Sequence, residues 1–189
     1  GNVFPVNSHG GTIAGHPVFQ TVQDLPKSVD LAIVVTPAAT VADIVTVCAK
    51  KRIRDIIVLS SGFQEAGPEG QAREQQLRDC VQQYQLNLLG PNCLGYAHGD
   101  FGINATFGPA LQRGGNITLI SQSGAMAVAL VDWARDVGIG IRAMVSMGNK
   151  AGLSEVELLR YCARDPETRM LLFYLESLER GQEFLALAR

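Results

Sequence analysis

Residues 117–127 read Ile117-Thr118-Leu119-Ile120-Ser121-Gln122-Ser123-Gly124-Ala125-Met126-Ala127, a β-rich apolar run that meets a Ser-Gln-Ser-Gly turn. Apolar residues at helical spacing follow at once and predict a helix. Ser121 or Ser123 is a natural N-cap, because a side-chain oxygen there accepts a hydrogen bond from an unpaired backbone N–H. Gly124 lacks a Cβ and leaves such N–H groups open to close approach. The stretch indicates an anion site at a helix start, with a capped turn that binds nothing as the alternative.

The same alternation of strand and helix continues after this stretch. Strands are expected at Ile141–Met147 and at the buried run Met170–Leu175, and helices at Ser154–Arg164 and from Gln182 onward. Ser154 is the expected N-cap of its helix, since Glu157 stands at the capping-box position. Upstream, glycines and prolines between Ala97 and Gly115 indicate a linker.

The first 100 residues also alternate strand and helix signals. Strands are expected at Val3–Asn7, Leu31–Thr36, Ile56–Ser61 and Leu86–Leu89, and helices at Thr40–Lys51 and Glu69–Tyr84. The continuous apolar character of Leu31–Thr36 is typical of a parallel strand covered on both faces. Because βαβ crossovers are right-handed, the order βαβαβ predicts a doubly wound α/β sheet.

Ligands bind at the carboxyl ends of the strands in such a sheet. Three loops should converge there, at Thr36–Ala38, Ser60–Phe63 and Gly90–Gly95. Cys93 lies in the last loop, and as a nucleophile it would need a general base nearby. His98 is five residues on, but nothing in the sequence shows that it faces the thiol. The alternative is that Cys93 is a small residue that fits its packing site.

Composition limits the class of protein. Of the 189 residues, 47% are hydrophobic and 18% are charged, which is typical of a globular α/β chain, and the net charge of −2 gives no basic field for nucleic acid or an acidic membrane. No apolar run approaches the ~20 residues that span a bilayer, and the first residues lack the features of a signal peptide. The four cysteines show no CxxC spacing, so we expect neither a metal site nor a disulfide, and a reducing cytoplasm.

Six ordered motifs run along essentially the whole chain. They are Pro5-Val6-Asn7, Leu89-Gly90-Pro91-Asn92-Cys93-Leu94-Gly95, Ser121-Gln122-Ser123-Gly124-Ala125, Ser146-Met147-Gly148-Asn149-Lys150, Asp165-Pro166-Glu167-Thr168 and Tyr174-Leu175-Glu176. Together they resemble the nucleoside-diphosphate-forming (NDP-forming) acyl-CoA synthetases, relatives of the succinyl-CoA synthetase α subunit. An ordered set of six is far more specific than any single motif.

The resemblance implies a fold and a reaction. It implies a Rossmann-like CoA-binding domain at residues 1–98, a linker at 99–115 and a flavodoxin-like ligase domain at 116–189, both domains incomplete. The reaction converts an acyl-CoA, phosphate and NDP into the acid, CoA and NTP, through an acyl phosphate and a phosphohistidine. CoA or acyl-CoA and phosphate would bind to this chain. NDP or NTP with Mg would bind to an ATP-grasp domain or subunit outside it, and homo-oligomerisation is left open.

The resemblance also implies roles for individual residues. The loops that cradle CoA would contain Asn7, Ser8, His9, Gly10, Thr36, Pro37, Ala38, Ser61, Gly62 and Phe63. Asn92 and Cys93 would lie near the thiol end of CoA. The phosphoryl group would be held by Ser121, Gln122, Ser123 and Gly124. Glu176 would be the catalytic residue that partners the phosphohistidine.

Two departures from the family pattern stand out. The opening strand and glycine-rich turn that precede this segment in the family are not found here, and the phosphorylated histidine is expected beyond Arg189. His9, His16 and His98 do not stand in the right context for that role. We therefore do not expect the chain to catalyse the ligase reaction on its own. The alternatives are an acyl-CoA sensor module of a bacterial protein lysine acetyltransferase and a CoA- or nucleotide-binding module without chemistry.

Overall fold

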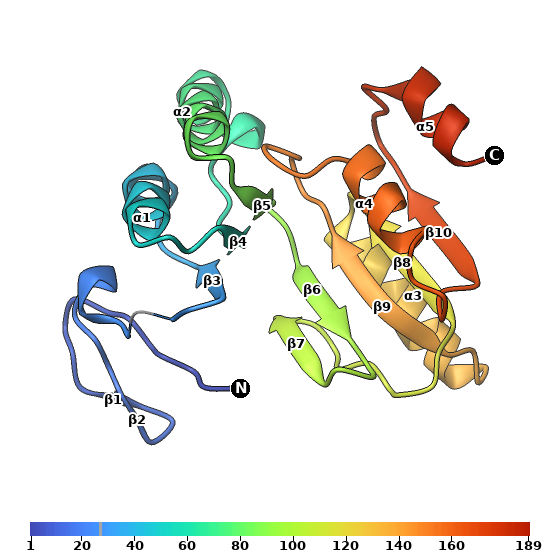
Figure 1. Ribbon diagram of the computed structural model, residues 1–189, viewed down its shortest axis with the longest axis horizontal. Coiled ribbons are helices and arrows are strands. Elements are labelled where there is room, and N and C mark those ends of the chain that lie inside the picture. Colours follow the sequence, from blue (N-terminus) through green and yellow to red (C-terminus); the bar gives the residue numbers. More distant parts are fainter. Residues whose placement is uncertain (27) are drawn as a thin grey trace.

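The computed structural model describes residues 1–26 and 28–189. Two sheets lie side by side, and a small hairpin stands at the N-terminal end (Figure 1). We call the sheet of β3, β4 and β5 the N-terminal sheet and the sheet of β6 to β10 the C-terminal sheet. The α/β class predicted from the sequence is confirmed.

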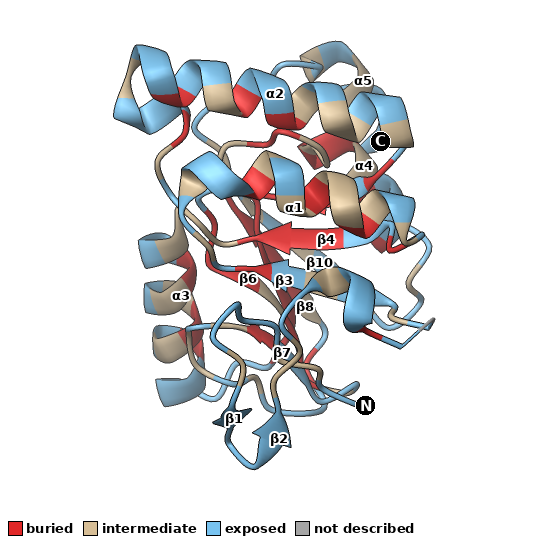
Figure 2. Cartoon of the chain, turned by 90° about the vertical axis from the view of Figure 1, so that its left-hand side faces the viewer, coloured by how far each residue is buried: buried red, intermediate tan, exposed pale blue. Residues whose placement is uncertain are grey.

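The N-terminal sheet is parallel, in the order β3-β4-β5. Its elements are β3 (Leu31–Val34), α1 (Ala38–Lys50), β4 (Asp55–Val58), α2 (Pro68–Tyr84) and β5 (Asn87–Leu89). Because both right-handed crossovers advance in one direction, α1 and α2 cover the same face, and buried residues gather between them and β4 (Figure 2). On the other face, Ile57 and Leu89 share a buried cluster with Val145 and Met147 of the C-terminal half.

The C-terminal sheet has the order β10-β8-β9-β6-β7, with β8, β9 and β10 parallel and β6 and β7 antiparallel. Its strands are β6 (Gly95–His98), β7 (Ile103–Thr106), β8 (Ile117–Ser121), β9 (Ile141–Ser146) and β10 (Met170–Tyr174). The helices are α3 (Gly124–Asp136), α4 (Glu155–Cys162) and α5 (Gly181–Leu187). Adjacent strand residues point to opposite faces, so Leu119 packs with α3 and Ile120 packs with α4.

Two predicted strands are less buried than expected. Ile33 in β3 is 46% exposed, and the pattern along β10 alternates between exposed and half-buried. Each is an edge strand in the described structure, with one neighbour, β4 for β3 and β8 for β10. The apolar runs therefore predicted these strands correctly, but they did not predict how far the strands are buried.

The chain departs from prediction at two further places. Within the expected strand Val3–Asn7, the structure has only an isolated bridge between Val6 and Phe19. The hairpin of β1 (Thr12–Ile13) and β2 (His16–Pro17) follows. Strand β7 lies inside the segment 99–115 and pairs with β6, so part of the expected linker belongs to the C-terminal sheet. The domain limits 1–98 and 116–189 stay a prediction.

Candidate functional site

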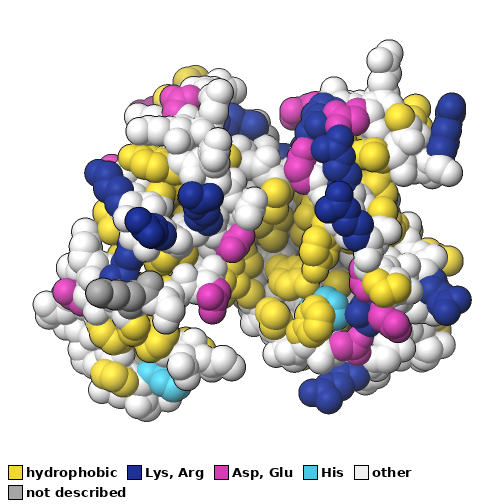
Figure 3. All heavy atoms as spheres, in the orientation of Figure 1, with side chains coloured by type: hydrophobic (Ala, Val, Ile, Leu, Met, Phe, Trp, Pro, Cys, Tyr) yellow, Lys and Arg dark blue, Asp and Glu magenta, His cyan; other side chains and the backbone are white. Residues whose placement is uncertain are grey.

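A cavity of about 620 Å³ lies where the carboxyl edges of both sheets meet. Separately from the cavity, the face drawn in Figure 3 has a hollow between the two halves of the molecule, where hydrophobic side chains gather. The cavity is lined by Leu59, Ser61, Gln64, Asn92, Cys93, Leu94, Phe107, Gln122, Ser123, Gly124, Ala125, Val128, Gly148, Asn149 and Glu176. Within this lining, as far as the structure describes it, Glu176 alone is charged.

The start of α3 forms one wall of the cavity. Ser123 is the N-cap, and its Oγ accepts a hydrogen bond from Met126 N at 3.3 Å. Ser121 is fully buried, and its Oγ accepts a hydrogen bond from Ser123 N at 3.1 Å. The anion donors are therefore fewer than the sequence suggested, because Ser123 N–H is already paired. Among the described residues, the N–H groups of Gly124 and Ala125 have no protein partner.

Gln122 lines the cavity and its side-chain amide also binds the loop after β10. Its Oε1 accepts hydrogen bonds from Glu176 N at 2.7 Å and Ser177 N at 3.0 Å. Its Nε2 donates to Ser177 Oγ at 3.3 Å. Gln122 thus clamps the loop after β10. The sequence did not indicate this contact, because Glu176 and Ser177 lie 54 and 55 positions further along the chain. The predicted contact of Gln122 with the phosphoryl group stays a prediction.

Glu176 stands at the rim of the cavity with an exposed side chain. The ion pairs that the structure describes do not include it. The N-cap of α5 is Arg180, without a side-chain cap, so Glu176 does not cap that helix. A carboxylate at this position is free to accept a hydrogen bond from an incoming group.

Three loops of the N-terminal sheet converge beside the cavity. Ser60 Oγ donates to Thr36 O at 2.6 Å, and Asn92 N donates to Ser60 O at 2.9 Å. Gly62 has a φ of +103°, and an added Cβ would lie 3.0 Å from Ala38 Cβ. Thr36, Pro37 and Ala38 therefore neighbour Ser61 and Gly62, as predicted for strand ends of one sheet.

The loop of Asn7, Ser8, His9 and Gly10 does not join this group. None of these residues lines the cavity. Asn7 Oδ1 accepts a hydrogen bond from His9 N at 2.9 Å, and Gly10 N donates to Asn7 O at 2.9 Å. The structure shows a self-contained turn there, and its contact with CoA stays a prediction.

Glu65 occupies the backbone donors of the predicted CoA loop. Its Oε1 accepts hydrogen bonds from Gly62 N at 2.6 Å and Phe63 N at 3.1 Å. Its Oε2 accepts one from Asn149 Nδ2 at 2.8 Å. Partial burial raises the pKa of Glu65, but these hydrogen bonds outweigh it and lower the pKa from its ordinary value. Phe63 itself is 1% exposed, so its ring belongs to the core.

Cys93 fits the packing interpretation. Its side chain is buried, and Sγ donates to Val58 O at 3.3 Å. Burial raises the pKa of the thiol to about 12, which keeps it protonated at neutral pH. His98 is also buried and stacks on Phe101 with ring centroids 4.2 Å apart. The described geometry therefore supplies no activated thiolate.

No group of three or more His, Cys, Asp or Glu side chains within residues 1–26 and 28–189 is arranged to hold a metal ion. A separate search of these residues finds no helix with the length and apolar character needed to cross a membrane.

Two family models match successive parts of the chain. Residues 1–99 match the CoA binding domain, and residues 114–189 match the succinyl-CoA ligase like flavodoxin domain. The chain belongs to the NDP-forming acyl-CoA synthetase family. The resemblance of the six sequence motifs is thus confirmed.

Relatives of this synthetase-family chain match it along its whole length. It is 40% identical to acetate–CoA ligase [ADP-forming] I of Archaeoglobus fulgidus and 40% identical to 4-hydroxybutyrate–CoA ligase [ADP-forming] of Nitrosopumilus maritimus, with 100% of this chain covered in each case. A dinucleotide forming acetyl-coenzyme A synthetase 1 of Ca. Korarchaeum cryptofilum, solved in complex with phosphate and ADP, shares 36% identity over 98% of this chain with a TM-score of 0.91.

This synthetase-family chain spans only part of those proteins. It covers 28% and 27% of the two curated relatives and 40% of the solved chain. The activity of the whole relatives is therefore not carried over directly.

Proposed function

We propose that this chain supplies the CoA-binding and phosphate-binding parts of an NDP-forming acid–CoA ligase. The observation that supports this most is the cavity in which loops from both sheets meet, with the start of α3 on one wall and Glu176 on the rim. The reaction interconverts acyl-CoA, phosphate and NDP with the acid, CoA and NTP.

The first step joins phosphate to the acyl group. A phosphate oxygen attacks the thioester carbonyl carbon, the carbon–sulfur bond breaks, and CoA leaves as a thiolate. The N–H groups of Gly124 and Ala125 donate hydrogen bonds to the phosphate, and the dipole of α3 stabilises its negative charge. Asn92 and Cys93 line the same cavity. In this proposal they border the thioester end of CoA.

The second step moves the phosphoryl group to a histidine nitrogen, and the carboxylate of the acid leaves. Glu176 accepts a hydrogen bond from the other ring nitrogen, which fixes the tautomer and stabilises the imidazolium that forms. In this proposal a further segment supplies the histidine, and NDP with Mg binds to an ATP-grasp domain or subunit. We place the protein in the cytoplasm.

The test uses a chimera in which this chain replaces the matching segment of the Archaeoglobus fulgidus ligase. We expect phosphate-dependent release of CoA and formation of phosphohistidine from a panel of acyl-CoA thioesters. A chimera that folds and binds acyl-CoA but releases no CoA from any of them contradicts the proposal and favours a sensor.

Gly124→Val tests the phosphate site, with Gly124→Ala as its matched control. An added Cβ would lie 3.4 Å from Leu94 Cβ, so valine methyl groups crowd the donors while Ala at the same position is tolerated. We expect Gly124→Val to lower the rate of CoA release at least about tenfold, while its affinity for acyl-CoA in calorimetry stays unchanged. Equal release by Gly124→Val and Gly124→Ala would place the phosphate site elsewhere.

A further inference from the structure

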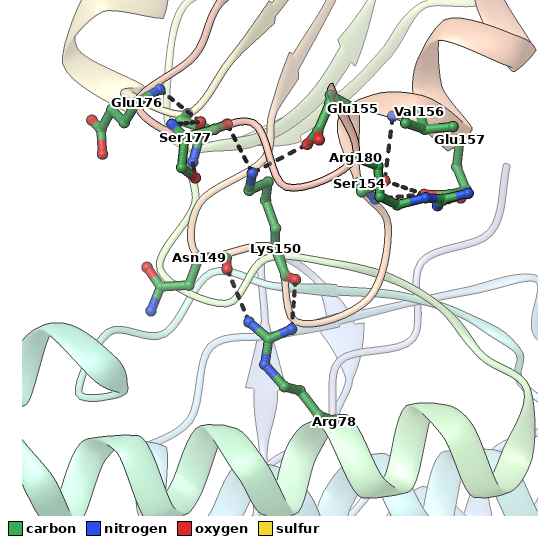
Figure 4. Close-up of polar contacts among 11 residues, drawn as sticks. Arg78, Asn149, Lys150, Ser154, Glu155, Val156, Glu157, Glu176, Ser177 and Arg180 are labelled. Carbon is green, nitrogen blue, oxygen red and sulfur yellow. Dashed lines mark hydrogen bonds and ion pairs between the residues drawn. The ribbon is translucent and has the colours of Figure 1, made fainter. Parts of the chain in front are cut away.

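Lys150 is a buried lysine just after β9. It is 5% exposed, and its Nζ donates to Glu155 Oε2 at 3.1 Å and to Ser177 O at 3.1 Å (Figure 4). Glu155 is fully buried, and its second oxygen, Oε1, has no partner among the described residues. The charges of Lys150 and Glu155 are thus removed from water, and Lys150 makes only two hydrogen bonds in return, one of them to a backbone carbonyl.

The cost of this arrangement indicates a purpose other than packing. An apolar pair of similar volume is often as stable as a buried ion pair or more stable. Lys150 also adopts a left-handed backbone with a φ of +58°, which costs on the order of 1 kcal/mol for a residue with a Cβ. A side chain that only filled space would need neither feature.

The backbone of Lys150 is held from the N-terminal half. Arg78 of α2 donates to Lys150 O at 3.2 Å and to Asn149 O at 3.5 Å (Figure 4). Gly148 and Asn149, just before it, line the cavity. The side chain of Lys150 therefore runs from a fixed loop on one cavity wall to the loop after β10.

The target of Lys150 is the residue next to Glu176. Gln122 holds Ser177 by its N–H, and Lys150 holds Ser177 by its carbonyl oxygen. We propose that Lys150, locked by Glu155, is a positioning residue that holds Glu176 at the rim of the phosphate cavity. The inference rests on the function proposed above for Glu176 and adds a second group, besides Gln122, that fixes its place.

The test is a double-mutant cycle on the whole chain with inorganic phosphate as the probe. The Gly124 and Ala125 amide shifts in ¹H–¹⁵N spectra report the dissociation constant. The variants are Glu176→Gln, the charge-neutral pair Lys150→Met with Glu155→Leu, and all three changes together. Lys150→Arg is the conservative control.

A fixed carboxylate at the rim repels phosphate weakly through water, so Glu176→Gln should tighten binding about threefold. The Met/Leu pair should tighten it in the same direction, because the loop that carries Glu176 is then held by Gln122 without Lys150. In the Glu176→Gln background, the Met/Leu pair should cause no further change in phosphate affinity. The control Lys150→Arg should keep the wild-type affinity. A merely structural loss would change affinity equally in both backgrounds.

The positioning role is overturned if the Met/Leu pair leaves affinity at the wild-type value, or changes it equally with and without Glu176. If Glu176→Gln itself has no effect on phosphate affinity, Glu176 does not stand at the phosphate site and the positioning role fails. Phosphohistidine formation by the chimera tests the proposed function separately, so the two failures are distinguishable. Should the Met/Leu pair not fold, Lys150→Gln with Glu155→Gln replaces it. Both amides fill the site, and a glutamine side chain is too short to reach the Ser177 carbonyl as Lys150 does.

Discussion

At the residue scale, Glu65 decides how the predicted CoA loop behaves. Its carboxylate is held by two backbone N–H groups of its own loop and by Asn149 from the other half of the molecule. An anionic group of CoA at Gly62 and Phe63 must therefore replace an internal carboxylate. Glu65 acts as a competitor for the donors that the loop offers.

Glu65→Ala tests this competition. Removing the carboxylate frees two N–H donors, so we expect CoA affinity in calorimetry to rise several-fold, up to about tenfold. The exposed Glu69→Ala, on α2, is the control and should leave affinity unchanged. Weaker binding by Glu65→Ala would instead make Glu65 part of the CoA contact.

Cys93 gives a second prediction at this scale. Because burial raises its pKa to about 12 and leaves it 5% exposed, iodoacetamide at pH 8 should modify it far more slowly than the half-buried Cys80. Mass spectrometry of the two peptides over time gives both rates. Rapid modification of Cys93 in the folded chain would return it to the list of reactive groups.

At the element scale, α4 is stabilised at its start by a capping box. Ser154 Oγ accepts a hydrogen bond from Val156 N at 3.3 Å, and Glu157 Oε2 accepts one from Ser154 N at 3.1 Å. Glu157 also pairs with Arg180, which precedes α5. The cap therefore fixes both the helix start and the approach of the last helix.

The capping carboxylate should make stability depend on pH. Partial burial raises the pKa of Glu157, but hydrogen bonds from Ser154 and Arg180 outweigh it and lower the pKa to about 2. A lowered pKa contributes stability above the ordinary value of 4.5, and this contribution is lost as pH falls from there toward 2. In urea unfolding, Glu157→Gln should lower stability at pH 7 and flatten the loss between pH 4.5 and 2.5. The exposed Glu179→Gln should keep the wild-type slope, and a wild-type slope for Glu157→Gln would contradict the assignment.

At the scale of the whole molecule, the two sheets are joined by a shared apolar cluster and by polar contacts around Arg78. Arg78 pairs with the buried Glu74 at 2.8 Å and donates to two carbonyls of the loop after β9. Glu74 Oε2 also accepts a hydrogen bond from Asn149 Nδ2 at 2.8 Å. The cavity thus depends on contacts between residues about 70 positions apart.

Arg78→Ala should loosen this junction. It leaves the buried Glu74 with one partner fewer and uncovers two carbonyls, so we expect a loss of about 2 kcal/mol in the free energy of unfolding. Arg135→Ala, whose pair with Asp132 is half-exposed on α3, should cost less than about 0.5 kcal/mol. Equal costs in urea unfolding would mean that the junction does not depend on Arg78.

The sequence alone determined the local features of this protein. Apolar periodicity located β8 and the helices, and the six motifs indicated the family. Ser154 was recognisable as a cap, and Ser121 or Ser123 as another, of which the structure selects Ser123. These signals depend on neighbours a few residues away. The convergence of Thr36, Ser60 and Asn92 also followed, since parallel strands end at one edge.

The tertiary structure alone decided which partners meet across the chain. It placed β6 and β7 in the C-terminal sheet, made β3 and β10 edge strands, and turned Gln122 toward Ser177. Pairing over long separations depends on which surfaces remain after the helices have packed, and no local pattern encodes that choice. For the same reason the sequence did not indicate the contact of Lys150 with Ser177. Burying a lysine costs desolvation free energy unless the carboxylate and carbonyl that accept its hydrogen bonds are brought to it by the fold.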